Sequence, residues 1–171
     1  MSKLRVRRAL VLAGAAVALS VALSGCSAIN GLLGGGPGDA ERDEETGQVT
    51  ESANVDVFSL KVGDCKMSSA TGLIEAVDIV PCDEPHDEEV YHEFAMEDGE
   101  FSEEAIDAAT EGCIGDAYTD FVGVVWDESA LEVYPITPTK DTWEQMNDRV
   151  IQCVIFDSAG PVEGSLKGSK R

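Results

Sequence analysis

The chain has 171 residues, of which 33 are Asp or Glu and only 12 are Lys or Arg, so its formal net charge at pH 7 is −21. This charge excludes binding to nucleic acid and adsorption on anionic lipid headgroups, which both need a basic surface. The length allows one domain with additional terminal segments. A solvated acidic surface is the simplest interpretation of the charge, and a cationic partner or divalent cations are the alternative.

Residues 1–25 have the pattern of an export signal. An apolar run over residues 9–22 follows four basic residues, which are Lys3, Arg5, Arg7 and Arg8. The run is too short to span a bilayer, because a membrane helix needs about 20 apolar residues. It therefore predicts a cleaved signal peptide, and the Arg7-Arg8 pair leaves the export route open between the Sec and twin-arginine systems.

The apolar run ends at Leu23-Ser24-Gly25-Cys26. This tetrapeptide resembles the lipobox of bacterial lipoproteins, in which the cysteine receives a diacylglycerol and the chain is cut just before it. The resemblance implies a palmitate-bearing lipid on Cys26 and a location on the extracytoplasmic face of the cell membrane. Two or three acyl chains hold a protein firmly, since each buried methylene adds about 0.8 kcal/mol.

The mature chain divides into three parts by composition. Residues 26–55 are rich in Gly, acidic and small polar residues and predict a disordered tether. Residues 56–157 carry a globular pattern and predict the folded domain. Residues 158–171 are rich in Gly, Ser and Lys and predict a flexible tail.

Four cysteines remain after the lipidated Cys26. An even number in an exported chain predicts two disulfides, and four cysteines allow three connectivities. Zinc binding is the competing interpretation, but the cysteines are widely spread and no Cys-x-x-Cys pair occurs, which disfavours it. The four are Cys65, Cys82, Cys113 and Cys153.

Strands are predicted in chain order from apolar alternation and turn residues. The first spans 57–62 and ends at the Gly63-Asp64 turn, and the second spans 75–81. A third spans 89–96, with Val90, His92, Phe94 and Met96 on one face. The last two span 131–137, where Pro135 predicts an edge or a bulge, and 149–156.

One main helix is predicted between the third and fourth strands. Ser102 is a suitable N-cap, apolar residues recur at helical spacing through Phe121, and Gly123 is a natural stop. Thr139 caps a second, shorter helix, which ends at Asn147. The sum is an α+β fold, a small antiparallel sheet covered by one main helix and stapled by two disulfides.

A set of motifs distributed over the domain resembles one family. They are Val62-Gly63-Asp64-Cys65, then Val80-Pro81-Cys82 followed by Pro85-His86, then Cys113 on a helix, and finally Tyr134, Pro138-Thr139, Trp143, Arg149 and Cys153. The series resembles the septum-formation domain family of actinobacterial envelope proteins over roughly residues 58–156. The resemblance implies the pairs Cys65–Cys82 and Cys113–Cys153 and an association with cell division, and it assigns no reaction.

Three residues are candidates for a binding site: His86, Asp64 and Arg149. A His beside carboxylates could act as a general base, but no nucleophile in a strained turn and no free thiol accompany it. The preferred interpretation has His86 fixing a turn through a backbone carbonyl. Asp64 is expected to form a turn, and Arg149 to pair with Asp64 or Asp148. His92 is expected to be a core histidine.

The sequence thus predicts a membrane-anchored extracytoplasmic lipoprotein with a non-enzymatic interaction domain, linked to cell division or envelope assembly. Its expected partners are the membrane, through the lipid on Cys26, and an envelope or division protein, with no nucleic acid. No cofactor, metal site or catalytic residue is predicted. The alternative is a lipoprotein that binds a small ligand or a divalent metal through the acidic surface and His86.

Overall fold

The structure is a computed structural model that describes residues 39–69 and 74–171. The expected signal peptide, Cys26 and the expected tether up to residue 38 lie outside these ranges. Within them, every helix is too short or too polar to cross a membrane.

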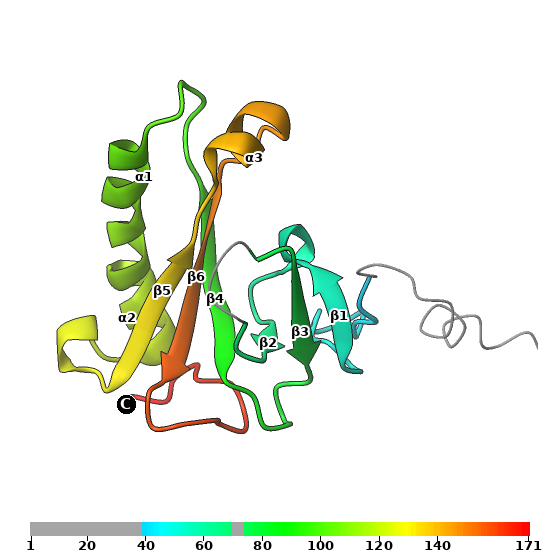
Figure 1. Cartoon of the computed structure of the whole chain (residues 1–171). Coiled ribbons are helices and arrows are strands. Elements are labelled where there is room, and N and C mark those ends of the chain that lie inside the picture. The colour runs from blue at the N-terminus through cyan, green and yellow to red at the C-terminus, as the bar shows by residue number, and fades with distance from the viewer. Residues whose placement is uncertain (1–38, 70–73) are drawn as a thin grey trace, which may run out of the picture. The chain divides into compact units, whose positions relative to one another are not determined.

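The described residues form a six-stranded sheet in which neighbouring strands are antiparallel (Figure 1). The strand order is β1-β3-β2-β4-β6-β5. The strands are β1 (Ala53–Asp56), β2 (Cys65–Lys66), β3 (Ala76–Val80), β4 (Glu88–Ala95), β5 (Leu131–Ile136) and β6 (Val150–Asp157). The predicted strands at 75–81, 89–96, 131–137 and 149–156 correspond to β3, β4, β5 and β6. Pro135 lies in the edge strand β5, where its missing N–H leaves no inner ladder bond unmade.

The helices are α1 (Glu103–Thr110), α2 (Asp116–Val122) and α3 (Lys140–Gln145). Ser102 caps α1 through a hydrogen bond that its side chain accepts from Ala105 N, and Thr139 forms a capping box on α3. Gly123 ends α2 with a φ of 91°, and Asn147 follows α3 with a φ of 56°. These left-handed residues confirm the predicted helix ends.

The predicted main helix is interrupted in its middle. A 3-10 turn (Glu111–Ile114) separates α1 from α2, and Gly115 between them is not helical. Gly112 allows the Phe94 ring to approach closely, because a Cβ there would lie 3.1 Å from Phe94 Cζ. The interruption places the buried Cys113 in the 3-10 turn, where it bonds to Cys153 of β6.

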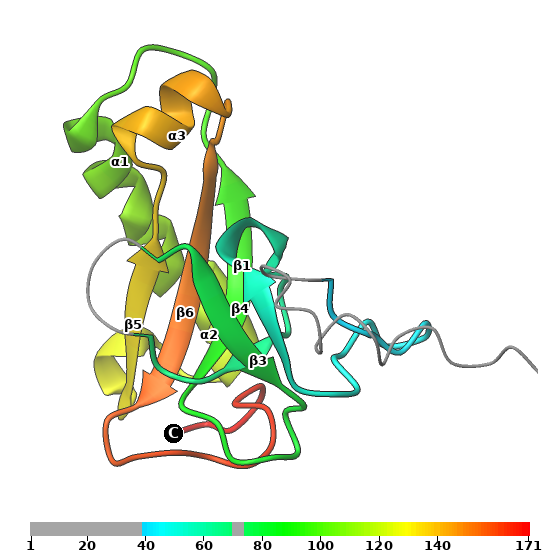
Figure 2. The same ribbon diagram turned by 45° about the vertical axis from the view of Figure 1, so that its right-hand side comes forward.

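Two apolar cores flank β4 and β6. The helix-side core comprises Tyr91, Cys113, Tyr118, Val122, Leu131, Ile151, Cys153, Ile155 and Leu166. The strand-side core comprises Val49, Val55, Val57, Leu60, Val77, Ile79, Val90 and Val154. Because side chains alternate along a strand, β6 contributes Cys153 and Ile155 to one core and Val154 to the other. α1 and α2 therefore lie against β4, β5 and β6, while α3 lies at the end of β5 and β6 (Figures 1 and 2). The strand-side core belongs to the β1–β3 half of the sheet.

A bulge in β4 changes the expected alternation. The register with β6 shifts between Val90 and His92, so that Tyr91 and Phe94 pack into the same core while Val90 joins the other. Val90 and Phe94, which strict alternation placed on one face, are thus on opposite faces. His92 is half-buried with its ring centroid 5.7 Å from that of Phe94, and is not the core histidine that the alternation predicted.

The folded part begins before residue 56, where the tether was expected to end. Val49 and Val55 are buried in the strand-side core, and Ala53–Asp56 pairs with β3. The predicted strand at 57–62 is instead a 3-10 turn (Val57–Ser59), which starts where the Asp56 side chain accepts a hydrogen bond from Phe58 N at 2.9 Å. The expected boundary was wrong because the segment before residue 56 is mostly polar, and such strands give a weak signal.

The expected flexible tail also packs on the domain. Val162 exchanges two backbone hydrogen bonds with His86, and Leu166 is buried in the helix-side core. Gly168 N and Lys170 N donate to Phe121 O and Val122 O, which satisfies carbonyls at the end of α2. Residues 158–171 are therefore part of the fold.

The two disulfides are Cys65–Cys82 and Cys113–Cys153, which confirms the pairing that the family resemblance implied. The first joins β2 to the turn after β3, and the second joins the 3-10 turn to the middle of β6. The sequence separations of 17 and 40 residues correspond to stabilisation by about 3 and about 4 kcal/mol in the loop-entropy model.

Replacing Leu166 by Ala tests whether the tail belongs to the domain. The variant should lower the free energy of unfolding by about 2–4 kcal/mol, because it leaves a cavity in the helix-side core. Urea unfolding of residues 39–171 measures this, with Lys167→Ala, an exposed neighbour, as the control. Equal stability of the two variants would mean that the tail does not contribute to the core.

Candidate functional site

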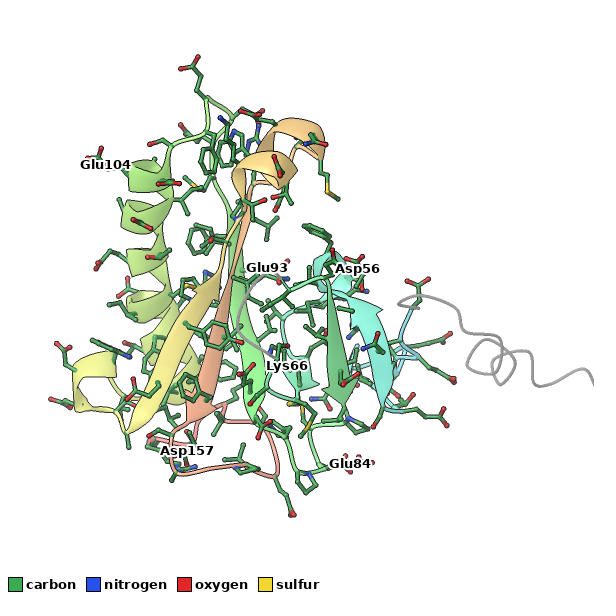
Figure 3. The ribbon with its side chains drawn as sticks, in the orientation of Figure 1. Asp56, Lys66, Glu84, Glu93, Glu104 and Asp157 are labelled. Atoms are coloured by element: carbon green, nitrogen blue, oxygen red, sulfur yellow. A yellow bond between two sulfur atoms is a disulfide. The ribbon has the colours of Figure 1, made fainter. Side chains whose placement is uncertain are left out.

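The buried charged side chains lie on β2, β4 and the segments that precede them. Four are at most 2% exposed, which are Asp64, Lys66, His86 and Glu89. Figure 3 shows Lys66 in the body of the sheet and Glu84, two residues before His86, at one end of it. Ionised groups are costly to bury unless they are paired, so each of these should have a partner.

His86 lies in the turn that follows Cys82. Its side chain is fully buried, and Nδ1 lies 2.8 Å from Glu84 O, so an Nδ1–H group donates to that carbonyl. Its backbone pairs with Val162 in both directions. Nε2 is buried without a hydrogen-bond partner. The ring therefore braces the turn, and solvent does not reach it in this arrangement.

Glu89 lies near the start of β4, in contact with the C-terminal segment. Its two carboxylate oxygens accept hydrogen bonds of 2.7 Å, one from Ser165 Oγ and one from Leu166 N. Burial raises the pKa of Glu89 above its usual value, while these two hydrogen bonds and the nearby His86 and Lys167 act in the opposite direction. Glu89 was not a candidate from the sequence, because the predicted strand at 89–96 placed it on the face opposite Val90 and Phe94.

Lys66, Glu88 and Tyr134 form a second polar cluster. Lys66 Nζ forms an ion pair with Glu88 Oε2, and Tyr134 OH donates to the same oxygen at 2.6 Å. Burial, together with the hydrogen bond and the charge of Glu88, raises the pKa of Tyr134 far above its usual value. The cluster ties β2 and β4 to the edge strand β5, and no sequence signal singled out Lys66.

Asp64 pairs with a residue that was expected to lie in the tether. Arg42 Nη1 and Nη2 bind the two oxygens of Asp64, the second at 2.8 Å, and Lys61 N donates to Oδ2 at 2.8 Å. Asp64 thus forms the expected turn contact and also anchors residues 39–50 to the domain. The expected pair between Asp64 and Arg149 was wrong, because Arg42 occupies the carboxylate.

Arg149 lies at the opposite end of β4 and β6. Its guanidinium stacks on the Trp143 ring at 3.8 Å and its Nη1 donates to Trp143 O and Asp148 O. Its acidic partner is Asp98, at 3.3 Å from Nε, and not the carboxylate of Asp64 or Asp148. Trp143 is 5% exposed, so the arginine covers a ring that belongs to the interior. The three candidate residues therefore do not converge on one site.

The described residues line at least two surface pockets. One of about 520 Å³ lies beside Arg149 and is lined by Phe101, Trp143, Glu144 and other residues of the same end. The other, of about 240 Å³, is lined by apolar and charged side chains, among them Arg42, Val55, Phe58 and Leu60. Phe58 is 52% exposed at this pocket, an exposure that is unusual for a large aromatic residue.

The described residues contain one group of three side chains whose ligand atoms could surround a metal ion, made of Cys65, Cys82 and Glu89. The two sulfurs are joined in a disulfide, and a metal requires thiolates as ligands. The group thus lacks the donors for a metal site in this state. His86 does not supply one to the acidic surface either, because its ring is enclosed.

The comparison with protein families identifies the domain. A family model described as "Septum formation" matches residues 62–169, which is more than half of the chain. The chain belongs to the Septum formation family. No curated protein and no solved structure matches it.

The two ends of the matched range can be compared with the elements of the fold. The Septum formation match extends through residue 169, so it includes the C-terminal segment that holds Glu89 and completes the helix-side core. It starts at residue 62, so β1 and the Arg42–Asp64 ion pair depend on residues before the matched range. The family match supports a role related to cell division.

The three tyrosines offer a test of the polar interior by pH. Burial raises the pKa of Tyr91, Tyr118 and Tyr134 above the usual value of about 10. A raised pKa of an acid in the folded state stabilises the fold below the unfolded value, and this stability is lost as the pH rises further. Absorbance at 295 nm should therefore rise in one step, together with loss of the circular dichroism of the fold, above about pH 10. Ionisation of any tyrosine with the fold intact would contradict the described burial.

Proposed function

We propose that the chain is an extracytoplasmic protein, anchored to the membrane by a lipid on Cys26, whose folded part binds an envelope or division protein without catalysing a reaction. The observation that carries the proposal is the Septum formation match over residues 62–169. The anchor rests on the lipobox-like sequence that ends at Cys26. A domain held at the membrane surface at a division site is suited to recruit or position another protein.

The charge distribution supports a partner with a basic face. All 33 acidic residues lie after residue 38, whereas four of the 12 basic residues lie before it. Three of the remaining basic residues are neutralised within the fold, because Arg42, Lys66 and Arg149 each pair with a carboxylate. The domain therefore attracts cationic surfaces, and it is repelled by anionic lipid headgroups.

The pocket at Phe58 supports an anchoring point for that partner. Phe58 and Val62 are 52% and 49% exposed, and the chain between them, with Leu60 and Lys61, lines the 240 Å³ pocket. Exposed aromatic side chains beside a pocket are typical of binding hot spots. A basic segment of an envelope protein that carries one apolar side chain fits this surface.

The residues that could have carried catalysis are engaged within the fold, which favours a binding role. His86 is enclosed and braces its turn, Asp64 is held by Arg42, and Arg149 covers Trp143. The four described cysteines are all in disulfides. A nucleophile activated by an adjacent base, which most hydrolases use, is therefore not formed among these side chains.

A Cys26→Ser variant tests the anchor. It should move the protein from the membrane fraction to the soluble extracytoplasmic fraction and abolish incorporation of labelled palmitate, because the thiol that would carry the lipid is gone. Cell fractionation and labelling measure both effects. A variant that stays in the membrane fraction would contradict the lipid anchor and leave the binding domain untested.

Phe58→Ser tests the proposed binding surface. The variant should lower the yield of crosslinked envelope or division protein by about tenfold or more, as expected for loss of a hot spot of 2 kcal/mol or above. Its free energy of unfolding should change by less than about 0.5 kcal/mol, because the side chain is exposed. Val125→Ser is the matched control, since Val125 is 46% exposed and lies outside this pocket. Equal yields from both variants would contradict this surface.

A further inference from the structure

The two disulfides have different surroundings. Cys113 and Cys153 are 1% and 0% exposed and lie within the apolar helix-side core. Cys65 is also fully buried, but Cys82 retains 9% exposure. The Cys65–Cys82 bond is therefore less completely enclosed than Cys113–Cys153, because Cys82 is the most exposed of the four cysteines.

An ionisable group lies beside this bond. The sulfurs of Cys65 and Cys82 and a carboxylate oxygen of Glu89 all lie within 4.8 Å of one another. Glu89 is 2% exposed, and the ring of His86, which acts on its charge, is fully buried with Nε2 unpartnered. The Cys113–Cys153 bond instead lies in a core whose ionisable members are Tyr91 and Tyr118, and Tyr91 OH donates to Cys113 O.

We propose that Cys65–Cys82 is a thiol–disulfide exchange site for a protein dithiol, in which the carboxyl group of Glu89 gives a proton to the departing sulfur. The thiolate of the partner attacks Sγ of Cys82, a new sulfur–sulfur bond forms, and the Cys65–Cys82 bond breaks. Cys65 leaves with the electron pair and takes the proton of Glu89, which becomes a carboxylate.

The second step completes the exchange and returns a proton to Glu89. The second thiol of the partner loses its proton to the Glu89 carboxylate. It then attacks the partner's first sulfur in the mixed disulfide, which releases Cys82 as a thiolate. The partner dithiol has then been oxidised by two electrons, and the Cys65–Cys82 disulfide has been reduced by two. Poor leaving groups slow exchange, so a proton donor beside a buried sulfur accelerates the first step.

The C-terminal segment contacts two of the residues that take part in this exchange. Gly164 N donates to Cys82 O at 2.6 Å, and Ser165 and Leu166 donate to Glu89. The C-terminal segment therefore holds both the attacked residue and the proton donor. This inference concerns chemistry beyond the proposed binding role and does not depend on it.

The test compares the two disulfides within one protein. Folded protein containing residues 39–171 is treated with dithiothreitol, free thiols are trapped by alkylation at intervals, and each cysteine is quantified by peptide mass spectrometry. Cys65–Cys82 should be reduced at least about tenfold faster than Cys113–Cys153, because a less enclosed disulfide with a proton donor beside it exchanges faster. Equal rates, as expected when both bonds open only on global unfolding, would overturn the proposal without requiring any variant.

Glu89→Gln separates proton transfer from access. It should slow reduction of Cys65–Cys82 by at least about tenfold, in line with the loss of a general acid. Glu93→Gln, an exposed glutamate on the same strand, should have no effect. The rate of Cys113–Cys153 in each sample reports whether the variant remains folded. An unchanged or faster rate in Glu89→Gln would overturn the proposal, since Glu89 would then only anchor the C-terminal segment.

The pH profile gives a readout that a structural role would not change. Each rate is divided by the fraction of dithiothreitol present as thiolate. The corrected wild-type rate should decline as Glu89 loses its proton, with His86 and Lys167 as the ionisable groups near it. The corrected rate of Glu89→Gln should be flat. Parallel profiles for the two proteins would contradict proton donation by Glu89.

Discussion

The fold depends on β6, and above all on Cys153 at its centre. β6 pairs with β4 on one side and β5 on the other, so it is the strand that joins the long strands into one layer. Its successive side chains pack into two separate cores, with Cys153 in the helix-side core and Val154 in the strand-side core. The Cys113–Cys153 bond then fixes the helical layer at the 3-10 turn, where the backbone could otherwise hinge.

The C-terminal segment completes this arrangement and links it to the polar interior. Leu166 fills the helix-side core, while its N–H group satisfies the buried Glu89 carboxylate. A buried carboxylate is tolerated only when it is hydrogen-bonded, so Glu89 and the segment require each other. The same segment reaches His86 through Val162. One acidic residue therefore couples the tail, the turn after Cys82 and the start of β4.

The sequence could predict the elements whose signal is local. β3 and β6 have strong apolar patterns, and the caps at Ser102 and Thr139 depend only on nearby residues. β1 could not be predicted, because Val55 is the only large apolar residue of Ala53–Asp56. The stretch 57–62 alternates like a strand, but the Asp56 side chain caps a 3-10 turn at its start instead. The bulge in β4 is equally invisible, since it is set by the register with a strand about 60 residues away.

The polar interior was the least predictable part for the same reason. Glu89 meets residues 76 and 77 positions further along the chain, and Asp64 meets Arg42 in a segment that composition assigned to the tether. An acidic run gives no indication of which carboxylate will be buried, because that depends on donors supplied from elsewhere. The family resemblance did predict the disulfide pairing, and the match to residues 62–169 supports a role related to cell division.

The central functional claim is that the folded domain brings the chain to the site of division through a protein partner. Time-lapse microscopy of the full chain, with a fluorescent protein that folds outside the cytoplasm inserted after residue 38, tests this most directly and leaves the C-terminal contacts intact. The account predicts enrichment at the division site before constriction, and loss of that enrichment when residues 39–171 are removed. A uniform distribution over the envelope throughout the cell cycle, the same with and without residues 39–171, would contradict it.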